Sequence, residues 1–154
     1  SIPDWLNEYK ETRLDIDEKQ CPDIVSSMVD MGDIGEFDAV YCCHALEHLF
    51  PYEVEMALNE FRRVLKKGGV AMVFVPDLEN VRPTEEVLFT SPSGNITGMD
   101  LIYGLRVAFK ENPYMLHKTG FTKDTLAKSF EDAGFEKIET RNLEPYNLFC
   151  LGVK

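Results

Sequence analysis

The side chains best suited to chemistry in this sequence lie directly after two apolar runs in the middle of the chain. His44, Glu47 and His48 follow the first run. Asp77 follows the second run. An imidazole titrates near neutral pH and serves as a base or a metal ligand, and a carboxylate accepts hydrogen bonds or binds cations. These four residues are therefore the first candidates for a binding or catalytic site.

His44, Glu47 and His48 also match the pattern H-x-x-E-H of certain zinc peptidases. In that pattern two histidines one helical turn apart bind the metal, and the glutamate acts as the base. The pattern requires a continuous helix, whereas here an apolar run leads directly into His44 and Pro51 starts a new helix soon after His48. We therefore expect no bound metal, and a zinc peptidase is only a remote alternative.

A strand–helix–strand unit positions these candidates. Phe37–Cys43 is a short run rich in strand-forming residues, and Val70–Val75 is a second run that ends at Pro76. Residues 51–65 between them place apolar side chains at helical spacing. Two apolar strands joined by a crossover helix are typical of a parallel sheet, in which ligands bind beyond the carboxyl ends of the strands.

Shorter elements are expected on both sides of this unit. About 40 residues, 79–118, are interrupted by prolines and turns, and this length exceeds that of ordinary loops. We therefore expect a functional insertion or lid there. The other expected elements are a helix from Ser1, strands over 12–16 and 23–28, helices capped by Thr97 and Thr122, and a terminal antiparallel strand pair over 135–143 and 148–153.

Several segments in this order resemble motifs of the class I S-adenosylmethionine-dependent methyltransferases. The segments are LDID at 14–17, VDM at 29–31, FDAVYCCHALEHL at 37–49, FRRVLKKGGVAMVFVPD at 61–77, HKTGFT at 117–122 and AGF at 133–135. The resemblance implies a single α/β domain over residues 1–154, with a Rossmann-like, mostly parallel sheet and helices on both faces. The C-terminal strands would form an antiparallel edge, and the insertion would bind the substrate.

The resemblance also implies which residues contact S-adenosylmethionine. An acid that ends the second strand of the family accepts hydrogen bonds from the ribose hydroxyls, and this acid is Asp15, with Asp17 as the alternative. A carboxylate only accepts hydrogen bonds, and a ribose diol offers two donors side by side. The cofactor positions implied are Asp15, Ile16, Asp30, Met31 and His44, of which the pair 30–31 would recognise adenine and His44 would line the methionine side.

The catalytic residue cannot be identified from a motif in this family. The methyl group on a sulfonium is already a strong electrophile, so that alignment and exclusion of water suffice for transfer. His44 and His117 are candidate bases because imidazole titrates near neutral pH. The positions expected to contact the methyl acceptor are His48, Tyr103 and His117.

One element of the family is missing from this sequence. The family begins with a strand and a glycine-rich turn, which would precede Ser1, and the first glycine here is Gly32. We expect the encoded protein to have an upstream segment of about five apolar residues followed by a turn with at least two glycines. Without it, the strands ending at Asp15 and His44 should leave a gap or pair with each other.

The composition of the chain limits which classes of partner it is expected to bind. The net charge is −11, from 27 acidic and 16 basic residues, and such a chain repels phosphate backbones, so nucleic acid is not expected. No run approaches a membrane span, and four cysteines show no disulfide pattern, so we expect a cytoplasmic protein without a membrane partner. The acceptor is expected to be a small molecule or a protein side chain. An inactive methyltransferase-like binding or regulatory protein is the main alternative, and the sequence leaves the oligomeric state open.

Overall fold

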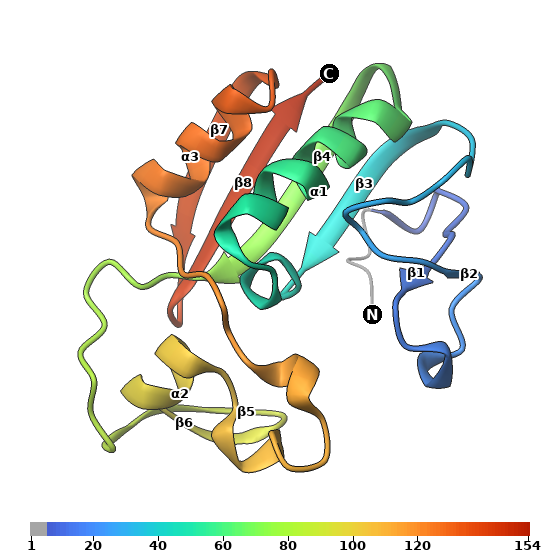
Figure 1. The fold of residues 1–154 in the computed structure, drawn as a ribbon. Helices are drawn as coiled ribbons and strands as arrows, with labels where there is room; N and C mark the ends of the chain where they lie inside the picture. The colour runs from blue at the N-terminus through green and yellow to red at the C-terminus, as the bar shows by residue number, and fades with distance from the viewer. Residues whose placement is uncertain (1–5) are drawn as a thin grey trace.

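The structure, a computed structural model, describes residues 6–154 (Figure 1). The first five residues of the helix expected from Ser1 lie outside this part of the chain. The centre of the molecule is a four-stranded sheet in the order β3-β4-β8-β7. Its strands are β3 (Phe37–Cys43), β4 (Leu65–Pro76), β7 (Glu136–Leu143) and β8 (Asn147–Val153).

The predicted strand–helix–strand unit is confirmed. The strands β3 and β4 pair in parallel, and α1 (Pro51–Val64) connects them. Proline at the first helical position leaves no hydrogen bond unmade, and the Glu53 carboxylate accepts the Phe50 N–H at 2.8 Å. The helix begins at Pro51 for these reasons. Its apolar stripe is buried against the sheet and consists of Val54, Ala57, Leu58, Phe61 and Val64.

The prediction of a mostly parallel sheet is only partly correct. In the central sheet β3–β4 is parallel, whereas β4–β8 and β7–β8 are antiparallel. The antiparallel C-terminal strands are confirmed, but β8 lies inside the sheet and only β7 is at its edge. Figure 1 shows α1 and α3 (Lys123–Asp132) over one face of the sheet, and α2 lies in the insertion. In the described residues, α-helices therefore cover one face of the sheet, whereas helices on both faces were expected.

The first two strands form a sheet of their own. β1 (Leu14–Asp15) and β2 (Ile24–Val25) pair in parallel and are shorter than expected. β1 lies between β2 and β3 in Figure 1, but no ladder joins β1 to β3 in the described chain. Of the two arrangements expected for the strands ending at Asp15 and His44, the structure has the gap. The β1 residue Leu14 packs against the core.

The insertion folds as a small lobe beyond the ends of β3 and β4 (Figure 1). It contains a hairpin of β5 (Val87–Ser91) and β6 (Gly94–Thr97), followed by α2 (Gly98–Tyr103). The expected cap at Thr97 is confirmed, but the helix ends at Gly104, whose φ is 92°. The next helical turn is the 3-10 helix η4 (Arg106–Ala108). The 3-10 helices of the described chain include η2 (Glu18–Gln20), η3 (Leu46–His48), η4 (Arg106–Ala108) and η5 (Pro113–Met115).

One ion-pair network stabilises this lobe. The Asp100 carboxylate is nearly buried and accepts the Arg106 Nε–H at 2.9 Å. Arg106 also binds Glu85 with its two terminal nitrogens, at 2.9 and 2.6 Å. This bidentate pair and the bond to Asp100 fix the segment after α2 relative to the segment that precedes the hairpin. In the described residues, no helix is both long and apolar enough to cross a membrane.

Candidate functional site

The chain turns sharply where β3 ends, and His44 occupies this turn. Its backbone φ is +50°, a left-handed conformation that is uncommon for a residue other than glycine. The His44 N–H donates to the Phe74 carbonyl at 2.8 Å, which holds the turn against β4. The His44 ring places Nδ1 3.2 Å from Glu47 Oε1. The strained turn therefore directs a histidine and a glutamate to the carboxyl end of the sheet.

A strap formed by residues 117–121 crosses the same end of the sheet. The backbone N–H groups of Lys118 and Thr119 both donate to the Glu47 carbonyl, at 2.8 and 3.2 Å. Further along, the Leu78 N–H donates to the Phe121 carbonyl at 2.9 Å. The strap is thus fixed to the ends of β3 and β4 by backbone hydrogen bonds, and it places His117 beside the turn after β3.

Three side chains from these two segments converge. One ligand-type atom each of Glu47, His48 and His117 lies within 4.8 Å of the other two. The rings of His48 and His117 are edge to face, with centroids 5.1 Å apart. Each ring Nδ1 lies near a backbone carbonyl: His48 near Leu116 at 3.1 Å and His117 near Leu101 at 2.9 Å. The first hydrogen bond ties η3 to the residue that precedes the strap, and the second ties the strap to α2.

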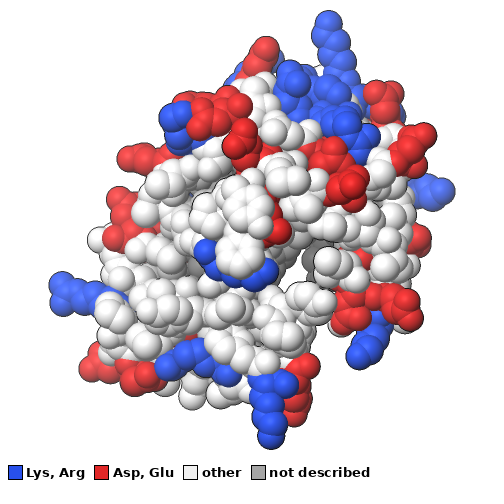
Figure 2. Space-filling view, in the orientation of Figure 1, with Lys and Arg blue, Asp and Glu red and all other residues white. Residues whose placement is uncertain are grey.

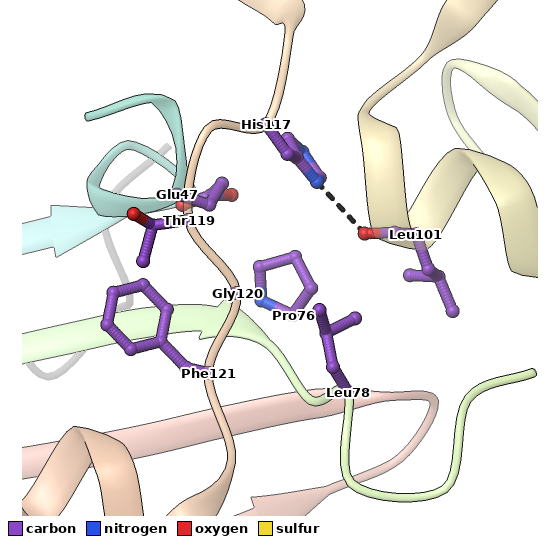
Figure 3. Close-up of a pocket in the computed structure, with 8 residues that line it drawn as sticks. All are labelled: Glu47, Pro76, Leu78, Leu101, His117, Thr119, Gly120 and Phe121. Carbon is purple, nitrogen blue, oxygen red and sulfur yellow. Dashed lines mark hydrogen bonds between the residues drawn. The ribbon is translucent and has the colours of Figure 1, made fainter. Parts of the chain in front are cut away.

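A small pocket adjoins these residues (Figure 3). It is a narrow depression with no room for a water molecule in this structure, and its lining includes Glu47, His117 and Thr119 from the cluster and the strap. Figure 3 shows Pro76 and Leu78 at the end of β4, with Glu47 on one side of them and Leu101 of α2 on the other. The pocket therefore lies between the sheet and the insertion.

Glu47 is the most unusual member of the group. Only 1% of the residue is exposed, and its Oε2 atom has no hydrogen-bond partner among residues 6–154. Glutamate is almost never fully buried unless it is paired, because removing a carboxylate from water has a large energetic cost. Among residues 6–154, the partner of the other oxygen is the half-exposed His44 ring alone. Thr119 Oγ1, in the same pocket, is also buried and unpaired in the described chain.

Two histidines have shifted pKa values, in opposite directions. The hydrogen bond to Glu47 raises the pKa of the His44 imidazole, and this effect exceeds that of burial. Burial lowers the pKa of the His117 imidazole, because desolvation penalises the charged ring.

Burial also raises the pKa of the Cys42 thiol, and it raises that of Cys150 to about 12. These two buried thiols are therefore protonated near neutral pH and unreactive.

The residues expected to contact the ribose lie at the end of β1. Asp15 is half-buried, and its Oδ1 accepts the Asp17 N–H at 2.8 Å. The described hydrogen bonds leave the second oxygen of Asp15 free to accept another. Asp17 instead caps η2 by accepting the Lys19 N–H at 3.0 Å. Ile16, between them, is 56% exposed.

Of the two residues expected to contact adenine, Met31 already has its backbone N–H engaged. The Met31 side chain is buried in the core, and its N–H donates to Glu60 Oε2 of α1 at 2.7 Å. The Asp30 carboxylate accepts the Gly32 N–H at 3.3 Å. Glu60 also binds Arg63 and is therefore held in place. A ligand at the Met31 N–H has to displace Glu60.

Of the three positions expected to contact the acceptor, the structure brings two together. His48 and His117 are in contact, whereas Tyr103 is 49% exposed at the end of α2 and is linked to the strap through its carbonyl, which accepts the His117 N–H at 2.9 Å. Asp77 is used structurally, since Asn142 donates to Oδ2 at 2.6 Å and the Glu79 N–H to Oδ1 at 3.0 Å. In the described chain, none of the other residues expected to contact the cofactor is hydrogen-bonded to His44; these residues are Asp15, Ile16, Asp30 and Met31.

The geometry of the peptidase pattern is not formed. His44 ends the turn after β3, and only residues 46–48 are helical, as a single 3-10 turn. The cluster of ligand-type atoms contains Glu47 and His48 but takes its second histidine from the strap, 69 residues further along. The sequence singled out Glu47 with His44 and His48 but gave no sign of Asn147, whose side chain contributes to the raised pKa of the His44 imidazole.

Comparison with known proteins agrees with this architecture. Residues 8–73 match the family model described as a methyltransferase domain. A comparison with curated proteins gives no significant match. Among solved structures, an S-adenosylmethionine-dependent methyltransferase from Archaeoglobus fulgidus aligns with 92% of this chain and 74% of its own, at 14% identity and a TM-score of 0.62.

Two longer proteins share the fold as well. An O-methyltransferase family protein from Burkholderia thailandensis has 14% identity and a TM-score of 0.57, over 84% of this chain and 34% of its own. Human N-acetylserotonin methyltransferase, solved with S-adenosylmethionine, has 15% identity and a TM-score of 0.54, over 84% of this chain and 32% of its own. The chain thus spans about a third of the length of these two structures, and at such identities the likeness shows the fold alone.

The sequence match and the fold together confirm the resemblance that the motifs indicated. The matched region runs from the segment before β1 into β4, and it includes the acid at the end of β1 and the turn at His44. Residues 8–73 thus resemble a methyltransferase domain in sequence, and the chain shares the fold of S-adenosylmethionine-dependent methyltransferases.

Proposed function

We propose that this chain is the methyl-transferring part of an S-adenosylmethionine-dependent methyltransferase. The observation that supports the proposal best is the position of Asp15, within the matched region, at the end of β1 with one carboxylate oxygen free. A ribose diol needs such an acceptor. The proposal extends the likeness in sequence and fold to an activity of this chain.

The residues present fit part of the cofactor. Asp15 would hold the ribose and the backbone at Ile16 would lie beside it, whereas the Met31 N–H is bound to Glu60 and is free for adenine only if Glu60 moves. His44 would line the methionine side. The cofactor, when bound, supplies an electrophilic methyl group, and the chain has to align the acceptor with it and exclude water.

The insertion is the part of the chain that we propose to hold the acceptor. It forms a separate lobe over residues 79–118 beyond the strand ends, within an otherwise single domain, and the pocket lies between this lobe and the sheet. His48 and His117, at that pocket or beside it, would contact the acceptor, with Tyr103 at its margin. A lobe over the strand ends is well placed to act as a lid.

The surface supports a small-molecule or protein acceptor. Figure 2 shows acidic and basic side chains interspersed around the edge of the visible face, with largely uncharged residues in its centre. With a net charge of −11, the whole chain attracts neither phosphate backbones nor anionic lipids. We therefore propose neither a nucleic-acid nor a membrane partner.

Calorimetry with the full-length protein tests the cofactor step. S-adenosylmethionine and S-adenosylhomocysteine should bind with one site per chain, and adenosine should bind more weakly because it lacks the amino-acid part. Protein that binds neither compound at millimolar concentration refutes the proposal. A second assay follows transfer of the label from methyl-labelled cofactor to hydroxyl-bearing small molecules and to proteins. Cofactor binding without turnover on any acceptor would favour the inactive, regulatory alternative.

A further inference from the structure

The cluster of Glu47, His48 and His117 has the composition and geometry of a metal site. We propose that these three side chains bind one divalent transition-metal ion of the Zn²⁺ type, where the sequence had led us to expect no metal. The proposal does not depend on methyl transfer, because the three ligands belong to the turn after β3 and to the strap rather than to the proposed cofactor positions.

The first argument is the unpaired carboxylate. Glu47 is 1% exposed, yet its Oε2 atom lacks a hydrogen-bond partner among the described residues. An unsatisfied buried polar group costs about 1–3 kcal/mol, and a charged one costs more. Lys118 contributes only its backbone N–H to Glu47, and its ammonium group lies over the Phe50 ring, 4.6 Å from the centroid. A bound cation would satisfy the orphan oxygen.

The second argument is the orientation of the two imidazoles. A backbone carbonyl can only accept a hydrogen bond, so each ring nitrogen that faces one must carry the proton. His48 faces the Leu116 carbonyl and His117 the Leu101 carbonyl, both through Nδ1. In the neutral rings, Nε2 therefore has the free lone pair. Metal-binding histidines commonly have this arrangement, in which the second nitrogen is held by a carbonyl or a carboxylate.

The distances allow one ion to reach all three groups. The three ligand-type atoms lie within 4.8 Å of one another. Zinc bonds to nitrogen and oxygen are about 2.0–2.2 Å long, so ligand atoms of a tetrahedral site are about 3.3–3.6 Å apart. The required approach of about 1–1.5 Å is within reach of side-chain rotation, and the fixed backbone of the strap already brings the two segments together.

The donor set defines the class of metal. Two imidazoles and one carboxylate suit zinc and its neighbours in the first transition row, whereas calcium and magnesium prefer sites made of oxygen atoms only. Three protein ligands leave a fourth position open to a water molecule or to an oxygen of a bound molecule. The ligand set also differs from the H-x-x-E-H pattern, because His117 takes the place of His44. His44 is then a positioning residue, which orients Glu47 through Oε1.

Metal binding can be tested directly with the full-length protein and Zn²⁺ alone. The protein is stripped with a chelator, dialysed and titrated with Zn²⁺ by calorimetry, with a metal-binding dye as competitor. We expect one ion per chain with a Kd of 10 μM or tighter, and a rise in Tm that added chelator reverses. No stoichiometric binding at this affinity by the folded wild-type protein overturns the proposal.

Variants then locate the ion. Glu47→Gln and His117→Gln should each weaken Zn²⁺ binding at least 100-fold. Glu55→Gln, an exposed position on α1, makes the same chemical change outside the cluster and should leave Zn²⁺ affinity within about twofold. Binding that is unaffected by both cluster variants would mean that Zn²⁺ binds surface carboxylates, and the proposed site would be wrong.

A spectroscopic readout does not depend on the stability of the variants. The chain has three histidines, so their imidazole NMR signals can be distinguished with few reference spectra. On addition of Zn²⁺, two rings should show large shifts at their Nε2 side, those of His48 and His117, while the His44 ring should keep its Nε2 environment. If His44 and His48 respond and His117 does not, the metal binds the peptidase pattern and the ligand set proposed here is refuted.

Discussion

Replacement of Asp15 by asparagine tests the proposed cofactor site with little disturbance of the fold. Asp15 Oδ1 accepts the Asp17 N–H at 2.8 Å, and an asparagine carbonyl can keep this bond. The second oxygen, which we propose for the ribose, becomes an NH₂ group that can only donate. The variant thus loses a hydrogen bond to a charged acceptor, which contributes about 1.5–3 kcal/mol. The Kd for S-adenosylmethionine should rise about 10- to 150-fold.

The matched control is Asp17→Asn. Asp17 caps η2 and accepts the Lys19 N–H, so this change removes the same charge two residues away without altering the ribose acceptor. Calorimetry of both variants, with circular dichroism to confirm folding, separates the two positions. An unchanged Kd for folded Asp15→Asn refutes the reasoning. A larger loss in Asp17→Asn than in Asp15→Asn transfers the ribose contact to Asp17.

Three further changes probe the insertion and the strap. Burial acts to raise the pKa of Asp100, but the hydrogen bonds from Thr97 and Arg106 together outweigh it and lower the pKa. The stabilisation by Asp100 is therefore present above the ordinary pKa of about 4 and is lost as the pH falls through the lowered value. Asp100→Asn should reduce hydrogen-exchange protection of the insertion by about 1.5–3 kcal/mol at pH 7 and by less below pH 4. Gly104→Ala would place its Cβ 2.0 Å from the Met115 carbonyl oxygen. It should therefore lower Tm more than Gly35→Ala, because Gly35 has a similar positive φ but no atom within 4 Å of an added Cβ. Equal decreases in Tm would show that the contact with Met115 does not matter. Deletion of residues 84–112 should leave cofactor binding within a few-fold and abolish transfer, whereas global unfolding, seen by circular dichroism, would contradict a lid.

The central unit was predictable because its signals are local. A proline at the first turn of α1, an apolar stripe at helical spacing and two continuous apolar runs specify both the elements and their order. The hairpin β5–β6 was not predicted, because the residues around its turn had the composition of an irregular loop. The order of the strands in the central sheet was not predictable from local signals either. β7 and β8 were correctly expected to pair, but strand composition does not show which of the two lies next to β4.

The cluster was beyond local reasoning because its parts come together only through the strap. His117 is 70 residues from Glu47 in sequence, and its position depends on the backbone N–H groups of the strap that bind the Glu47 carbonyl. The sequence contains no sign that Glu47 is buried, since glutamates are usually exposed. What the sequence did show was the turn after β3, where a parallel sheet places its ligands. The same turn holds His44, proposed for the cofactor, and Glu47, proposed for the metal, joined by one hydrogen bond. If both proposals hold, Zn²⁺ binding and cofactor binding should affect each other's affinity by the same factor, as thermodynamic linkage requires.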